Sequence, residues 1–339
     1  MRKFFVLLIL FLGVMVVMSS FSELERTLET LRKGNFWYLL VAFGVLLGWF
    51  FLVGITYRSI YRLLGMQDSI LNLTLLAAAA TFVNVVMPTA GVSGIAVFIN
   101  EARKRKQPSG KVTLAATLFL LFDEVAFLAV LALGLVALFR RGNLNAGEIG
   151  AALILFAVAS LLATVLYLGS RSVEAMGNFL ARIARLVNAI TRPFIHRDYL
   201  QEERAHEFAR ELAEGLAALP DRPRGFIKPM FLALLNKGLL VSIFLSAFLA
   251  FHVPYTVGTI FGGFAIGYMF MVVSPTPAGI GIVEGVLPLG LSSLRVPWSD
   301  AVLITLTYRA FTFWIPLAVG AFAFRILHLE DNNSSEVAE

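Results

Sequence analysis

VVSPTPAGIGIVE, residues 272–284, decides the fold, because its two prolines and its glycines interrupt a long apolar run. A proline inside a helix removes a backbone donor and clashes with the preceding turn, and glycines then let the chain reverse. A second stretch, VVMPTAGVSGI at residues 85–95, is similar and aligns more closely when one residue is inserted. Both stretches lie inside apolar segments, 69–99 and 256–294. The sequence therefore predicts two broken helical segments.

The composition is that of a membrane protein. Of the 339 residues, 58% are hydrophobic and 15% are charged, whereas a soluble globular protein is about half apolar and about a quarter charged. Apolar runs of about 18 residues or more recur along the chain, and each can cross a hydrocarbon core about 30 Å thick. We expect membrane spans at residues 4–21, 36–57, 112–139, 148–169, 226–252 and 299–325.

Short basic loops set the expected orientation. The loop 101–111 carries five basic residues and one acid, so we place it in the cytoplasm, together with Arg58 and Arg62. The segment 171–225 and both chain termini are then cytoplasmic, in a multi-pass protein of the cell membrane. The net charge of +6 fits basic loops that contact anionic lipid, and we expect no nucleic-acid partner.

The two broken segments belong to a predicted inverted repeat. Residues 115–139 and 301–325 align without gaps. Repeat one, 36–139, has an inward span, a broken segment and an outward span, whereas repeat two, 226–325, has the opposite directions. Such a pattern indicates a secondary-transporter architecture with a site near the bilayer midplane. The expected fold class is an all-α polytopic membrane protein in which the breaks form two re-entrant helical hairpins.

An alternative interpretation of each break is a proline kink within an ordinary span. Backbone N–H and C=O groups cannot face lipid, since each would cost several kcal/mol. The stretches 88–94 and 275–281 should therefore be buried in protein or face a wet cavity. Asn84 precedes the first break, where it can satisfy backbone groups set free around Pro88 or contact a ligand.

Three segments lie outside the repeats. The apolar run 4–18 follows two basic residues and is either a first span or a cleaved signal peptide. The segment 171–225 has apolar residues at helical spacing and predicts two amphipathic helices at the cytoplasmic interface, with a structural or a lipid-gathering role. We treat residues 1–329 as one transmembrane domain and residues 330–339 as a disordered tail.

Away from the ends of the apolar segments, the ionisable residues that stand out are Asp123, Glu124, Lys237, Glu284 and Arg309. A charge at the bilayer centre costs about 2.5–3.5 kcal/mol on insertion scales, so such residues are functional candidates. Asp123 and Arg309 occupy equivalent positions in the repeats, and we expect a near-two-fold axis to bring them together. Glu284 starts the helix after the second break, where it caps that helix or binds substrate or a proton. Lys237 can instead extend to the cytoplasmic interface.

The run PTPAGIGIVE at residues 275–284, followed by an amphipathic run and by Tyr308 and Arg309, resembles the flippase-like transmembrane region of lysylphosphatidylglycerol synthases and its stand-alone relatives. In that family the motif typically reads P-G-G-x-G-x-x-E, and an arginine sits in the last span. Asn84 and Pro88 resemble the family's first broken segment, and the resemblance covers nearly the whole chain.

The resemblance implies a membrane protein that translocates or handles lipids. Two departures matter: Ala278 replaces a glycine, and the first motif lacks the acidic and arginine residues often found just after it. Together with the buried charges, the resemblance implies a substrate site made from Glu284, Arg309, Gly279, Gly281, Pro275, Pro277, Asp123, Glu124, Lys237, Asn84 and Pro88.

We therefore expect a lipid flippase or transporter-like protein that handles an anionic phospholipid or a prenol-linked lipid, alone or as a homo-oligomer. The soluble aminoacyltransferase domain of full-length synthases is absent from this sequence, so enzyme activity is not expected. A membrane-embedded glycosyltransferase-type or lipid-modifying enzyme, and a non-transporting partner of one, are the alternatives. With no cysteine and four scattered histidines, the sequence predicts no cofactor and no metal site.

Overall fold

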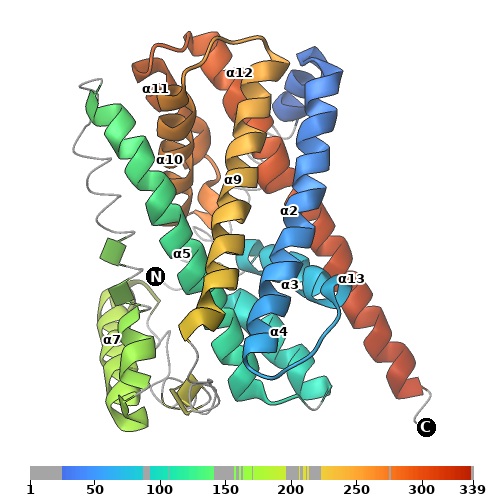
Figure 1. Cartoon of the computed structure of the whole chain (residues 1–339), viewed down its shortest axis with the longest axis vertical. Coiled ribbons are helices and arrows are strands. Elements are labelled where there is room, and N and C mark those ends of the chain that lie inside the picture. The colour runs from blue at the N-terminus through green and yellow to red at the C-terminus, as the bar shows by residue number, and fades with distance from the viewer. Residues whose placement is uncertain are drawn as a thin grey trace.

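The computed structural model describes residues 25–86, 92–105, 107–140, 156–157, 160–161, 163–169, 171–195, 206, 209–210, 212–213, 223–274 and 276–336. Every regular element in these ranges is a helix, which confirms the expected all-α class. The helices form an elongated bundle, with the C-terminal helix leaving it at one end (Figure 1).

Four long apolar stretches of the described chain are helical and long enough to cross a membrane. They belong to α2 (Phe36–Leu63), α5 (Ser109–Arg140), α9 (Ile227–Ala250) and the continuous run of α12 (Trp298–Arg309) into α13 (Ile315–Glu336). The spans predicted at 36–57, 112–139, 226–252 and 299–325 are thereby confirmed as helices. The predicted span 4–21 lies outside the described residues, as does half of 148–169.

Both predicted breaks divide a helix into two arms that pack against each other. The first pair is α3 (Ile70–Val86) and α4 (Val92–Lys104), and the second is α10 (Val257–Val273) and α11 (Ile282–Ser293). Figure 1 places α3 and α4 in the lower half of the bundle and α10 and α11 in the upper half. The first break, with Pro88, lies outside the described residues, and so does Pro275 in the second.

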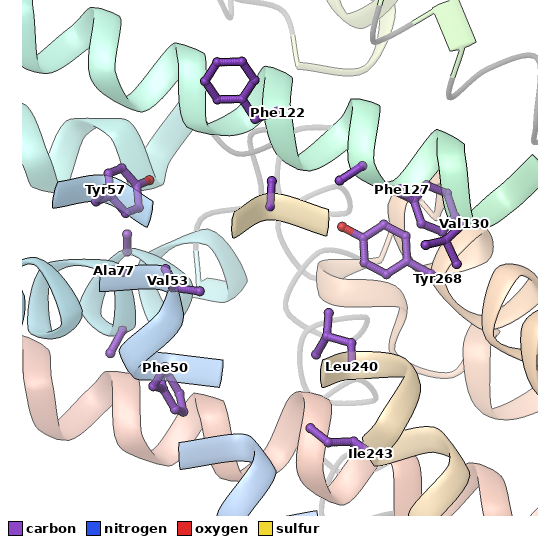
Figure 2. Packing of buried hydrophobic residues seen from close by; sticks show 14 of the residues in the cluster. Phe50, Val53, Tyr57, Ala77, Phe122, Phe127, Val130, Leu240, Ile243 and Tyr268 are labelled. Atoms are coloured by element: carbon purple, nitrogen blue, oxygen red, sulfur yellow. The ribbon is translucent and has the colours of Figure 1, made fainter. Parts of the chain in front are cut away.

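The core forms where the long helices pack on each other and on the broken segments. α2 lies along α9, α5 lies along α10, and α13 lies along α3. Aromatic rings fill these contacts: Tyr57 of α2 stacks on Phe119 of α5, with ring centroids 4.1 Å apart, and on Phe98 of α4, at 4.5 Å. Figure 2 shows Phe127 and Tyr268 side by side at the contact between α5 and α10.

Two glycines allow the long helices to approach the broken ones closely. A Cβ atom added at Gly134 of α5 would lie 2.8 Å from the Phe261 carbonyl oxygen of α10. A Cβ atom added at Gly320 of α13 would collide with the Ala78 carbonyl oxygen and would lie 2.9 Å from the Phe82 Cβ atom, both in α3. Small residues at such contacts let helix backbones pack tightly inside a membrane.

We expect Gly320→Ala to destabilise the protein by about 1–3 kcal/mol, the usual cost of overpacking, because the colliding atom belongs to the backbone. Gly44→Ala in α2 is the matched control, since nothing lies within 4 Å of its added Cβ atom. Alanine at that position gains up to about 1 kcal/mol of helix propensity. Thermal unfolding in detergent measures both variants, and equal midpoints would contradict the close packing of α13 on α3.

The two ends of the bundle differ in chemistry. Exposed aromatic residues start α2 and α12, with Trp37 72% exposed and Trp298 55% exposed. Arg62 lies in the last turn of α2, Lys104 ends α4, and Arg224 precedes α9. Figure 1 shows that α2 ends, and α9 begins, at the end of the bundle opposite the starts of α2 and α12. Aromatic belts and clusters of basic residues are typical of the two water-facing edges of a membrane protein.

The amphipathic helix predicted after residue 171 is present as α7 (Val173–Ile195). Its small residues Ala181 and Ala184 are buried, and Arg182 is exposed. The His206 ring occupies the space beside Gly177, where a side chain would collide with it. Most of the second predicted helix, 201–219, lies outside the described residues.

The last helix of the chain reaches into the segment from residue 330 for which the sequence predicts disorder. α13 continues as a helix to Glu336, and only residues 337–339 lie outside the described part of this tail.

Candidate functional site

Arg309 is the last residue of α12 and is buried, with 1% of its side chain exposed. It lies eleven residues after Trp298, which is about 17 Å along a helix and thus near the middle of a hydrocarbon core about 30 Å thick. A π-helical turn, Ala310–Trp314, follows it directly. π turns inside α-helices often occur at functional sites.

The partner of Arg309 is Glu284 of α11. Arg309 Nε donates a hydrogen bond to Glu284 Oε1, and the guanidinium lies over the Phe313 ring at 4.5 Å from its centroid. The Arg309 Nη2 group is buried, and it has no hydrogen-bond partner among the described residues. The site therefore contains a buried charge-assisted donor that is not used within the described protein.

The second break holds Glu284 in place. Ala278, Gly279 and Gly281 have positive φ angles of 48°, 76° and 78°, and the chain turns through them into α11. The Gly281 N–H then donates to Glu284 Oε2 at 2.8 Å. The Thr276 hydroxyl donates to the Ile280 carbonyl at 2.8 Å and satisfies one more group of the turn.

We expect Gly279→Ala to be more destabilising than Gly281→Ala. Both positions have positive φ, which costs a residue with a Cβ atom about 1–2 kcal/mol. Only at Gly279 would the new Cβ atom also collide, at 2.6 Å from Val283 Cγ2 and 3.0 Å from Met271 Cα, whereas the space around Gly281 is open. Overpacking adds about 1–3 kcal/mol. The comparison is made by thermal unfolding of the two variants, and the opposite order would contradict this turn geometry.

A second buried charge cluster lies between α5, α9 and α10. Lys237 Nζ donates to Asp123 Oδ2 at 2.7 Å and to the Tyr268 hydroxyl at 2.6 Å. The Tyr268 hydroxyl in turn donates to Asp123 Oδ2 at 3.1 Å, which closes a triangle. Lys237 has 2% of its side chain exposed and Asp123 has 23%, so the carboxylate is the accessible member of the pair.

Two polar groups beside this cluster lack partners among the residues that the structure describes. Glu124 Oε2 is buried without a hydrogen bond, and so is Asn236 Oδ1. The other end of the Asn236 amide donates to the Thr56 hydroxyl of α2 at 3.0 Å. Within the described ranges, no group of three or more His, Cys, Asp or Glu side chains could hold a metal ion.

The chain matches the model of a known protein family. The Lysylphosphatidylglycerol synthase TM region family matches residues 4–320. The chain belongs to this family. The family resemblance expected from residues 275–284 is thereby confirmed, and the protein is a multi-pass membrane protein of a lipid-related family. No curated protein matches the chain.

Two expectations for this member of the lysylphosphatidylglycerol synthase TM region family were wrong. Asp123 and Arg309 do not pair, because Lys237 reaches Asp123 from α9 and Glu284 reaches Arg309 from α11. Lys237 does not extend to the interface, because its ammonium group is buried between Asp123 and Tyr268.

Asn84, in the first broken segment, satisfies backbone groups near the break, which is one of the two roles expected of it. Its Oδ1 atom accepts from the Gly94 N–H at 2.7 Å and from the Ser93 hydroxyl at 2.8 Å. These bonds tie the end of α3 to the start of α4 and satisfy backbone freed by the break. The close approach also requires Gly94, since an added Cβ atom would lie 2.6 Å from Asn84 Nδ2.

The sequence alone does not single out Tyr268 and Phe313. Tyr268 binds both members of the Lys237–Asp123 pair, and Phe313 lies under the Arg309 guanidinium. Both occur in aromatic-rich apolar runs, where a ring that contacts a charge looks the same as a ring in the core. The sequence feature that points to such a polar partner is Lys237, because a cation in an apolar helix requires polar partners.

Proposed function

We propose that this protein moves a polar-headed lipid across the membrane and binds the phosphate of its headgroup at Arg309. The observation that carries the proposal is the buried Nη2 group of Arg309, which has no acceptor among the described residues. A buried donor without an acceptor costs about 1–3 kcal/mol, and more when it is charged. A ligand with an acceptor oxygen recovers that free energy.

Phosphate oxygens suit the guanidinium. Arginine presents several N–H donors in a rigid plane that matches phosphate geometry, and it stays charged under all ordinary conditions. Glu284 occupies only Nε in the described contacts, which leaves the outer edge of the group for a ligand. Anionic phospholipids and prenol-linked lipids both carry phosphate, so both belong to the proposed substrate class.

The packing supports the inverted repeat that the proposal requires. The last span of repeat one, α5, packs on α10 of repeat two through Gly134, and the last span of repeat two, α13, packs on α3 of repeat one through Gly320. The first spans, α2 and α9, pack on each other. We propose that α3–α4 and α10–α11 are re-entrant hairpins that enter from opposite sides of the membrane.

The basic end of the bundle supports the orientation that we propose. We propose that the end with Arg62, Lys104 and Arg224 faces the cytoplasm of the cell membrane, with both termini on that side. The protein acts in this proposal as a transporter and not as an enzyme. A lipid-modifying enzyme would instead change the chemical structure of the lipid that it binds, which analysis of lipids before and after incubation distinguishes.

Mass spectrometry of co-purified lipids tests the proposal. We expect the wild-type protein to retain a phosphate-bearing lipid and Arg309→Lys to lose most of it, since lysine keeps the charge but not the planar pair of donors. Arg325→Lys is the matched control, because Arg325 is an exposed arginine in the continuing helix α13. Identical lipid content in the wild type and Arg309→Lys would contradict binding at Arg309.

A further inference from the structure

The charge cluster between α5, α9 and α10 contains more carboxylates than cations. The five interior ionisable residues comprise two cations, Arg309 and Lys237, and three carboxylates, Glu284, Asp123 and Glu124. Arg309 is paired with Glu284, and Lys237 is paired with Asp123. Glu124 is left over, and its buried Oε2 atom has no hydrogen-bond partner in the described part of the chain.

An ionised Glu124 would be an unpaired charge in the membrane interior. Such a charge costs about 2.5–3.5 kcal/mol on insertion scales, and binding a proton removes that cost. The three interior carboxylates then divide into two that hold cations and one that holds a proton. We propose that Glu124 is a proton-binding site that couples lipid movement to a proton gradient; the coupling rests on the proposed lipid transport, whereas proton binding does not.

The groups around Glu124 favour the binding of a proton over the binding of a larger cation. On its own helix Asp123 adjoins it, and the charge of Lys237 on α9 acts on it. On α10 the Tyr268 hydroxyl bonds to both Asp123 and Lys237. A metal ion here would be repelled by the Lys237 ammonium. Rings enclose the cluster, since Phe127 stacks on Tyr268 at 4.1 Å.

Other helices packed on α5 contribute few charged or titratable groups near the cluster. Tyr57 of α2 stacks between Phe98 and Phe119 and is buried. The charged residues of α4 gather in its last turns, where Glu101 is paired with Arg105. Lys237 is therefore the cation shared by Asp123 and Glu124 among the described residues.

Because Asp123 and Glu124 share Lys237, gain or loss of a proton at Glu124 changes the contacts between α9 and α10. When Glu124 is neutral, Lys237 is held by Asp123 and Tyr268, and the Tyr268 bond ties α9 to α10. When Glu124 loses its proton, its charge attracts the same ammonium group and weakens that tie. Helix α10 is the first arm of the hairpin whose second arm, α11, carries Glu284.

Aromatic contacts connect the two clusters. Tyr268 lies beside Phe264 with ring centroids 5.9 Å apart, and Phe264 lies beside Tyr308 at 6.3 Å. Tyr308 directly precedes Arg309. Figure 2 shows the Tyr268 hydroxyl pointing toward α9, away from the Phe127 side of the ring. A movement of the Lys237 ammonium group is thus transmitted to the helices that hold the proposed lipid site. A ligand that binds one protonation state of Glu124 more tightly shifts the equilibrium between the two states.

Infrared spectroscopy of the purified full-length protein tests proton binding directly. We expect the C=O stretching band of a protonated carboxyl group at neutral pH, lost in Glu124→Gln and kept in Glu101→Gln, whose acid is paired with Arg105. Glu124→Met repeats the loss with a side chain that carries no amide band. Retention of the band in both Glu124 variants, or its absence from the wild type, would overturn the proton site.

Reconstituted vesicles test the coupling. We expect a pH difference of one unit to change the distribution of the lipid between leaflets by up to about tenfold in the wild type, and to have no effect in Glu124→Gln.

Replacing Na⁺ by a large organic cation should change nothing, and a response to Na⁺ instead of protons would overturn the proposal. Wild-type lipid movement that ignores the pH difference would refute the coupling. No lipid movement under any condition would refute the proposed transport, while the infrared result would still decide the proton site.

Discussion

Replacing Lys237 with methionine is expected to destabilise the protein by about 3–5 kcal/mol, the usual cost of removing one partner from a buried ion pair. The variant leaves Asp123 without its cation and removes the tie between α9 and α10 through Tyr268. Methionine fills much of the volume of lysine, so the loss reports charge and hydrogen bonding more than packing.

The measurement is chemical or thermal unfolding in one detergent. Lys228→Met is the control on the same helix, because Lys228 is exposed near the start of α9. Adding Asp123→Asn to Lys237→Met should recover part of the loss, since the orphaned charge is then removed. Equal destabilisation by Lys237→Met and Lys228→Met would show that the Lys237–Asp123 pair does not hold the bundle together.

Arg309→Lys is expected to fold and to lose lipid movement by about 10- to 100-fold. Lysine keeps a positive charge near Glu284 but cannot donate both to Glu284 and, from the same rigid plane, to a phosphate. A hydrogen bond to a charged group contributes about 1.5–3 kcal/mol, and each 1.4 kcal/mol is a factor of ten. The cation–π contact with Phe313 also weakens.

The assay follows a fluorescent phospholipid that becomes accessible to a membrane-impermeant quencher in reconstituted vesicles. Arg325→Lys is the matched control, and size-exclusion chromatography checks that each variant is folded. Arg309→Met should be less stable as well as inactive, because it leaves Glu284 without its cation. Wild-type rates in Arg309→Lys would exclude the guanidinium from the transport site.

Much of the fold could be predicted from the sequence, because apolar runs and proline–glycine breaks are local signals. The broken segments at 69–99 and 256–294 and the four long described helices follow from them. The five interior charges also stand out, since any ionisable residue in an apolar run is conspicuous. The family likeness of residues 275–284 rests on the same local pattern.

The pairing of those charges could not be predicted from the sequence. The alignment of the repeats puts Asp123 opposite Arg309, but the rotation of each helix about its axis decides which side chains meet. In the structure, α9 brings Lys237 to Asp123, and the turn at Gly279 and Gly281 brings Glu284 to Arg309. These are long-range relations that no periodicity encodes.

Ala278 shows how the structure explains a departure from the family pattern. The family motif typically has glycine here, and Ala278 has φ of 48°, in the left-handed region that glycine adopts without strain. The chain therefore tolerates strain at the break next to Gly279, which sits too close to Val283 and Met271 to be replaced. The same turn positions Glu284 for both Gly281 and Arg309.

The most direct test of lipid transport by this protein is the rate of lipid movement in vesicles that contain the wild-type protein, compared with protein-free vesicles of the same composition. We expect faster movement of at least one phosphate-bearing lipid in the wild type, and a rate that falls toward the protein-free value in Arg309→Lys but not in Arg325→Lys. Wild-type rates equal to those of empty vesicles, for anionic phospholipids and prenol-linked lipids alike, would contradict lipid transport by this protein.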